Sequence, residues 1–169
     1  GNGAKILITK SLPQGTDEET VNRCLKEYLA WYGPHAGIKT GPYEGISALL
    51  QALNERGVKM AVVSNKGDDQ VKDLCRKYFP EISVAIGERE GVRRKPCPDS
   101  VLEAIKELGA DPASAIFVGD SEVDAETAIQ ANLPFVAVSW GFRDKEELTA
   151  YHPVKLLEHP LDLLEGNEI

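Results

Sequence analysis

The sequence predicts an α/β fold with a mainly parallel sheet. From Asn54 onward, short apolar runs alternate with longer amphipathic stretches, which is the pattern of βαβ units. The runs are apolar along almost their whole length, as expected of strands buried on both faces of a sheet. The segments between them are long enough for helical crossovers between parallel strands. Four strands are predicted: Val58–Ser64, Ile82–Ile86, Ala115–Gly119 and Pro134–Val138.

Helices are predicted where apolar residues recur at helical spacing, in the ranges 46–53, 71–75 and 101–108. A glycine follows the first and the third of these ranges and marks the expected helix end. Asp99 or Ser100 is expected to cap the third helix. Ser121, with Asp124 three residues later, resembles a capping arrangement for a fourth helix.

The first forty residues differ in character from the rest. Thr16 reads as a helix N-cap followed by acidic first-turn residues, and the apolar stripe from Val21 to Leu29 predicts a helix outside the α/β alternation. Glycines and prolines then form a linker, with a boundary near Gly37–Gly41. We therefore expect a helical segment with its linker over residues 1–38 and an α/β domain over residues 39–169.

Composition excludes several classes of function. The net charge of −8 disfavours a nucleic-acid partner, which would need a basic face. No apolar run approaches the length of a membrane span, so no membrane association is expected. The three cysteines are scattered without metal-ligand spacing, which favours reduced thiols in the cytoplasm. No coiled-coil seam or apolar patch specifies an oligomeric state.

Polar residues follow three of the predicted strands or their loops, where ligands bind in open α/β sheets. Ser64 and Asn65 could hold a phosphate oxygen, or could simply begin a helix. Lys95, in a proline-stiffened basic segment, could neutralise a phosphoryl group, or could lie in a solvated loop. Asp120 and Asp124 lie one helical turn apart and could face one Mg²⁺ ion, or could form an ordinary acidic helix start.

The segments VVSNK, RRKPCPD and VGDSEVDAETA together resemble the haloacid dehalogenase superfamily, in its phosphoglycolate phosphatase-like branch. The resemblance implies a Rossmann-like core with a helical cap, and catalytic roles for Ser64 and Lys95. It further implies phosphate binding by Ser64, Asn65 and Lys95, and Mg²⁺ binding by Asp120 and Asp124. The segment WGFRDKEEL is also similar to this branch. Within it, Arg143 either forms a surface ion pair or reaches a substrate carboxylate.

The family's first motif, D-x-D-G-T, does not occur in this sequence. In the family its first Asp attacks phosphorus, and its strand lies between those predicted here at Val58–Ser64 and Ala115–Gly119. Omitting that strand would leave buried backbone groups unpaired, at a cost of about 1–3 kcal/mol each. We therefore expect an N-terminal segment outside this sequence to supply the strand, the nucleophile and the rest of the cap.

The resemblance implies Mg²⁺-dependent hydrolysis of a small phosphorylated metabolite, such as phosphoglycolate, through an aspartyl-phosphate. This chain without the nucleophile is expected to be inactive. Two alternatives stay open. One is a phosphomutase of the same superfamily, which would return the phosphoryl group to a sugar. The other is a non-catalytic module that binds phosphate or Mg²⁺.

Overall fold

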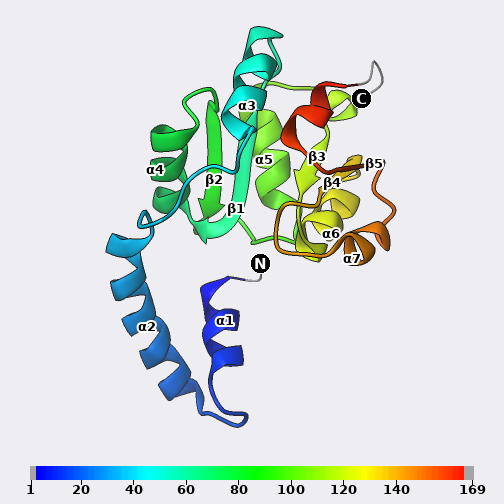
Figure 1. The fold of residues 1–169 in the computed structure, drawn as a ribbon. Coiled ribbons are helices and arrows are strands. Elements are labelled where there is room, and N and C mark those ends of the chain that lie inside the picture. Colours follow the sequence, from blue (N-terminus) through cyan, green and yellow to red (C-terminus); the bar gives the residue numbers. More distant parts are fainter. Residues whose placement is uncertain (1–2, 166–169) are drawn as a thin grey trace. The chain divides into compact units, whose positions relative to one another are not determined.

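The computed structural model describes residues 3–165 of a chain that divides into two compact units, Gly1–Gly41 and Pro42–Ile169 (Figure 1). The elements in chain order are α1 (Ala4–Ser11), α2 (Glu18–His35), α3 (Ile46–Glu55), β1 (Ala61–Gly67), α4 (Asp68–Tyr78), β2 (Val84–Glu88), α5 (Asp99–Leu108), η1 (Pro112–Ser114), β3 (Phe117–Gly119), α6 (Glu122–Gln130), β4 (Phe135–Val138), α7 (Lys145–Thr149), β5 (Lys155–Leu157) and η2 (Pro160–Leu164).

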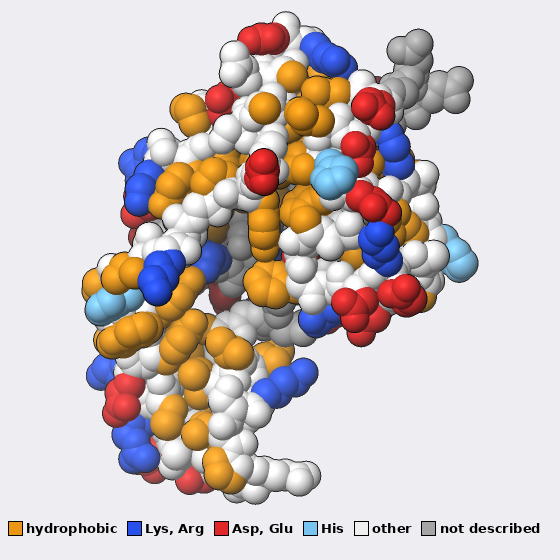
Figure 2. Space-filling view, viewed as in Figure 1, with side chains coloured by type: hydrophobic (Ala, Val, Ile, Leu, Met, Phe, Trp, Pro, Cys, Tyr) orange, Lys and Arg blue, Asp and Glu red, His pale blue; other side chains and the backbone are white. Residues whose placement is uncertain are grey.

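The first unit is a pair of helices, α1 packed against α2. Asp17 caps α2 by accepting the Thr20 backbone N–H at 2.8 Å, so the expectation of a cap at Thr16 is wrong by one residue. The reason is that the Asp17 carboxylate also accepts the Thr20 hydroxyl, at 2.9 Å. Helix α1 was not predicted. Hydrophobic side chains remain exposed over this unit (Figure 2), among them Leu7, Leu29 and Trp31.

The second unit contains two parallel sheets rather than one. Strand β1 pairs with β2, and β3, β4 and β5 pair in that order. Helices α4 and α5 pack against the first sheet, and α6 packs against the second. The largest apolar cluster joins α5 and α6 to β3 and β4. Within residues 3–165, no backbone pairing joins β1 to β3.

The predicted strands are present with shifted bounds. Strand β1 begins only at Ala61, because the Val58 N–H bonds back to Leu53 at the end of α3. It continues to Gly67 because that residue still pairs with β2, so Asn65 lies within the strand rather than beyond its predicted end at Ser64. The fifth strand, β5, is too short to show a periodic pattern and was not predicted.

The two predicted helix caps in this unit have different outcomes. Ser121 caps α6 as predicted, accepting the Asp124 backbone N–H at 3.4 Å. The prediction for α5 is wrong, because the helix begins at Asp99 after Pro98 and neither Asp99 nor Ser100 caps it. The Ser100 hydroxyl is instead buried, without a partner among the described residues. In the part of the chain that the structure describes, no helix has the length and apolarity of a membrane span.

Asp68 joins the start of α4 to strand β2. Its carboxylate accepts the Gly87 backbone N–H at 2.9 Å and pairs with Lys72 at 2.6 Å, with Arg89 3.5 Å away. Burial alone would raise the pKa of Asp68, but the bonds from Lys72 and Gly87 and the two cationic charges lower it below its ordinary value. The charged form is therefore favoured by folding.

We expect Asp68→Asn to lower the free energy of unfolding by about 1–3 kcal/mol at neutral pH, because it weakens these partly buried hydrogen bonds. A carboxyl group whose pKa is lower in the folded than in the unfolded state stabilises the fold at pH values above its unfolded-state pKa. This contribution disappears as the pH falls through the folded-state pKa. The difference between the variant and the wild type should therefore shrink below about pH 4. Urea unfolding at several pH values measures this difference in stability. Asp69→Asn is the control, because Asp69 is the exposed neighbour. An equal loss of stability in both variants would contradict the stabilising role of Asp68.

Candidate active site

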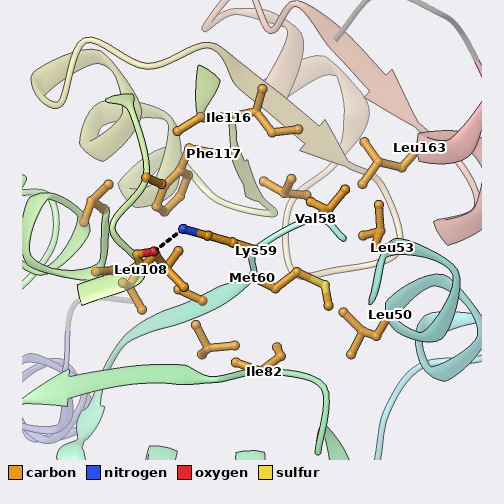
Figure 3. A pocket seen from close by; sticks show the side chains of 18 of the residues that line it. Leu50, Leu53, Val58, Lys59, Met60, Ile82, Leu108, Ile116, Phe117 and Leu163 are labelled. Carbon is orange, nitrogen blue, oxygen red and sulfur yellow. Dashed lines mark hydrogen bonds between the residues drawn. The ribbon is translucent and has the colours of Figure 1, made fainter. Parts of the chain in front are cut away.

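A cleft separates the two sheets of the second unit. It has a volume of about 1080 Å³ and is lined along most of its length by apolar side chains from β1, β3, α3 and α5 (Figure 3). Leu53 of α3 and Phe117 of β3 are among them, and the residues just before β1 and β3 add Val58, Met60 and Ile116. Lys95, Asp120 and Asp124 also line it, so the cleft combines apolar walls with a cluster of charged groups.

Lys59 is a cation of the cleft that the sequence did not single out. Its ammonium group donates hydrogen bonds to the carbonyl oxygens of Leu108, at 2.8 Å, and Gly109, at 3.1 Å. Leu108 is the last residue of α5 and Gly109 is its C-cap, and the carbonyls at a helix end have no partners within the helix. Lys59 therefore closes the end of a helix, which gives it a structural role.

Lys95 is held by two segments that are far apart in the sequence. Its backbone N–H donates to Asn65 Oδ1 at 2.7 Å, and its carbonyl accepts from Asn65 Nδ2 at 2.9 Å. The Lys95 ammonium group donates to Asp124 Oδ1 at 2.6 Å. The side chains of Lys95 and Asp124 are 11% and 8% exposed, so this is a buried ion pair. Asn65 therefore fixes the backbone that carries the cation.

Asp124 is the centre of this network. Its Oδ2 accepts the Ser121 hydroxyl at 2.6 Å and the Asp120 backbone N–H at 3.3 Å. Burial alone would raise the pKa of Asp124, but the charge of Lys95, together with the bonds from Lys95, Ser121 and Asp120, lowers it. The carboxylate is thus ionised and paired. A Cβ at Gly119 would lie 2.3 Å from the Asp124 Cβ, so only glycine fits at the end of β3.

Asp120 follows β3 directly and is only partly buried. Its Oδ2 accepts the Phe142 backbone N–H at 2.9 Å. No described residue forms a hydrogen bond with its other oxygen, Oδ1. The structure therefore keeps one carboxylate oxygen available beside the Lys95–Asp124 pair.

Ser64 lies on β1, one residue before Asn65. Its Oγ accepts the Lys66 backbone N–H at 3.2 Å, so the hydroxyl proton can still be donated to a ligand. The sequence prediction singled out Ser64, Asn65, Lys95, Asp120 and Asp124. Side-chain or backbone hydrogen bonds join all of these residues except Ser64, which lies on the same strand as Asn65.

The donor set suits a hard cation. Mg²⁺ is usually held by one or two carboxylates together with water and substrate phosphate, and Asp120 offers such an oxygen. Both oxygens of Asp124 already accept protein hydrogen bonds, which makes it a weaker candidate for direct coordination. Over residues 3–165 there is no group of three or more His, Cys, Asp or Glu side chains that could hold a metal by itself. A cation here would need ligands from elsewhere.

The sequence did not identify the partner of Arg143. The guanidinium group donates to both carboxylate oxygens of Glu122, at 2.7 and 3.0 Å. Of the two alternatives that the sequence left open, the structure shows the ion pair. The bonds and charge of Arg143 lower the pKa of Glu122, although burial acts in the opposite direction. Glu122 and Arg143 each follow the end of a strand, β3 and β4, but neither local sequence indicates that the two side chains pair.

We expect Lys95→Met to lower the free energy of unfolding by about 3–5 kcal/mol, because it leaves the Asp124 carboxylate buried without its counter-charge. The double variant with Asp124→Leu should recover part of this loss, since no buried charge remains. Lys145→Met is the control, because Lys145 and Glu158 form an exposed pair worth about 0–1 kcal/mol. Chemical denaturation measures all three variants. A loss from Lys95→Met no larger than the control would show that the pair is not buried in solution.

The comparisons with known proteins agree with this geometry. Residues 4–138 match the family model described as haloacid dehalogenase-like hydrolase. The chain is 31% identical to a phosphoglycolate phosphatase of Aquifex aeolicus, over 97% of this chain and 75% of that protein. It is 28% identical to the N-acetylmuramic acid 6-phosphate phosphatase of Pseudomonas aeruginosa, over 96% of this chain and 74% of that protein.

A solved structure shows the same fold. The crystal structure of a protein from Lactobacillus delbrueckii, assigned to the phosphoglycolate phosphatases, superposes with a TM-score of 0.93 at 33% identity. The match covers 98% of this chain and 78% of that one. The chain thus belongs to the haloacid dehalogenase-like hydrolases, as a phosphatase-type member of the phosphoglycolate phosphatase-like branch.

Proposed function

We propose that the protein hydrolyses a phosphomonoester of a small metabolite in a Mg²⁺-dependent reaction. The observation that carries this proposal is the assembly of Lys95, Asp124 and Asp120 at one end of the cleft, with one Asp120 oxygen available to a ligand. A fixed cation beside an available carboxylate suits a phosphoryl group accompanied by a divalent ion. Phosphoglycolate is the first substrate to test, because it is the substrate in the name of the Aquifex aeolicus relative.

The side chains of this chain would bind and orient the phosphoryl group. Lys95 would donate to a phosphoryl oxygen and offset its negative charge. Ser64 would donate its hydroxyl proton to a second oxygen, since its Oγ already accepts the Lys66 N–H. Asn65 would act by holding the Lys95 backbone in place rather than by contacting phosphate. These residues position the group for attack.

A bound Mg²⁺ ion would offset charge on the phosphoryl oxygens. Asp120 would supply a direct ligand. Both oxygens of Asp124 already accept hydrogen bonds within the protein, so Asp124 would not coordinate the ion directly. It would fix Lys95 and accept hydrogen bonds from water on the ion.

The attacking carboxylate would come from a strand that is not part of this sequence. The cleft separates β1 from β3, and neither strand pairs with the other in the described part of the chain. An extended apolar segment between them could satisfy the exposed backbone groups of both strands. An aspartate at the end of that segment nearest Lys95 would be the nucleophile that forms the aspartyl-phosphate.

The first unit would be part of the helical cap that selects the leaving group. Its exposed apolar side chains, such as Leu29 and Trp31, are available for packing with the remainder of a cap. We place the reaction in the cytoplasm because all three cysteines, Cys24, Cys75 and Cys97, are free thiols, which fits a reducing compartment.

Lys95→Ala, tested in protein that contains the nucleophilic segment, should reduce kcat by about 10²–10³-fold, because it removes a charge that stabilises the transition state. Phosphate release from phosphoglycolate in the presence of Mg²⁺ is the measurement. Lys72→Ala is the matched control, since Lys72 lies on α4 and pairs with Asp68. Near-normal turnover by a folded Lys95→Ala variant would remove Lys95 from the mechanism.

Phosphate release, together with analysis of the products and of binding, separates the alternatives. A phosphomutase would convert a sugar phosphate into its isomer with little free phosphate. A non-catalytic module would bind phosphate or Mg²⁺ without turnover. N-acetylmuramic acid 6-phosphate belongs in the substrate panel, because the Pseudomonas aeruginosa relative is named for it. If no phosphate is released from either compound or from other small phosphomonoesters, the proposed hydrolysis is wrong.

The 169-residue chain alone should release no phosphate, and the backbone amides of β1 and β3 that face the cleft should exchange rapidly with solvent. Adding a peptide with an apolar strand followed by Asp-x-Asp-Gly-Thr should slow that exchange. The control peptide has the same composition in scrambled order. Hydrogen-exchange mass spectrometry measures the protection, and turnover by the chain without the peptide would contradict the requirement for a second segment.

A further inference from the structure

The loop between β4 and α7 contacts the side chain of Asp120. Within it, the Phe142 N–H donates to Asp120 Oδ2 at 2.9 Å, while the Phe142 side chain is 83% exposed. A Cβ placed at Gly141 would lie 2.1 Å from the same Asp120 oxygen. The loop backbone therefore fixes the orientation of the carboxylate, and the aromatic ring takes no part in this contact.

The loop is anchored by ion pairs of Arg143, the shorter with Glu122 and a longer one, 3.8 Å, with Glu147 of α7. Arg143, the residue after Phe142, donates to both oxygens of Glu122, at 2.7 and 3.0 Å, and Glu122 lies two residues after Asp120 on the first turn of α6. Two parallel hydrogen bonds constrain orientation as well as distance, which a single contact between exposed charges does not. The Arg143 and Glu122 side chains are 40% and 31% exposed.

We infer that the Glu122–Arg143 pair is a positioning device for Asp120: it holds the loop so that the Phe142 N–H binds Oδ2 and leaves Oδ1 directed to a ligand. Glu122 and Arg143 are positioning residues and touch no substrate. This inference rests on the proposed function, because Asp120 is assigned there as the metal ligand. Gly141 is part of the same device, since any side chain at this position would displace the carboxylate.

The first test measures the exchange of the Phe142 amide proton by NMR, in the whole protein without metal. Glu122→Gln should increase that exchange rate by about tenfold, as expected when a hydrogen bond to a charged group is weakened. Glu103→Gln is the matched control, because Glu103 pairs with Arg89 at 2.6 Å and its side chain is 35% exposed. Unchanged exchange in Glu122→Gln would overturn the inference.

The second test measures Mn²⁺ affinity by electron paramagnetic resonance. Glu122→Gln and Gly141→Ala should each weaken binding by about three- to tenfold, because Oδ1 loses its fixed direction, whereas Glu103→Gln should not. Faster exchange in Glu122→Gln with unchanged Mn²⁺ affinity would overturn the link to Asp120.

The two tests separate this inference from the proposed function. Exchange of the Phe142 amide needs neither metal nor turnover. If the wild-type protein binds Mn²⁺ but hydrolyses no phosphomonoester, while both tests give the expected changes, the positioning device stands and the proposed reaction fails. If the wild type binds no Mn²⁺, the assignment of Asp120 as a metal ligand fails, and with it the inference.

Discussion

The buried ion pair between Lys95 and Asp124 is the constraint on which the rest of the site depends. Its atoms lie 2.6 Å apart on side chains that are about nine-tenths buried, where either charge alone would be costly. The pair joins the segment before α5 to the first turns of α6, and Asn65 adds β1 through two bonds to the Lys95 backbone. Three segments distant in sequence are therefore held together by one set of polar contacts.

The sequence predicted these residues because parallel strands end at a common edge, so polar residues after different strands come together. Lys95 and Asp124 could be placed near each other on this basis. Their direct bond could not, because it depends on side-chain rotamers and on burial. The two bonds from Asn65 to the Lys95 backbone were likewise beyond the sequence, since they depend on how β1 continues past Ser64.

The fold was predictable where patterns are long, and it was not where they are short. Helix α5 shows a strong apolar period, but its start depends on Pro98, which displaced the expected cap. Strand β5 has three residues, too few for any period, and is recognisable only from its pairing with β4. The Glu122–Arg143 pair joins residues that are far apart in the sequence, and nothing in either local segment indicates the partner.

The charges of the site explain why the proposed reaction would need a cation. Lys95 and Asp124 neutralise each other, so Asp120 leaves the described part of the site with a net negative charge. A phosphomonoester, itself an anion, would be repelled by such a site, and an attacking aspartate would add further negative charge. A divalent cation on Asp120 would reverse this balance while leaving the Lys95–Asp124 pair intact. The Phe142 amide fixes the Asp120 carboxylate through Oδ2, and the available Oδ1 is where the structure could accept that charge.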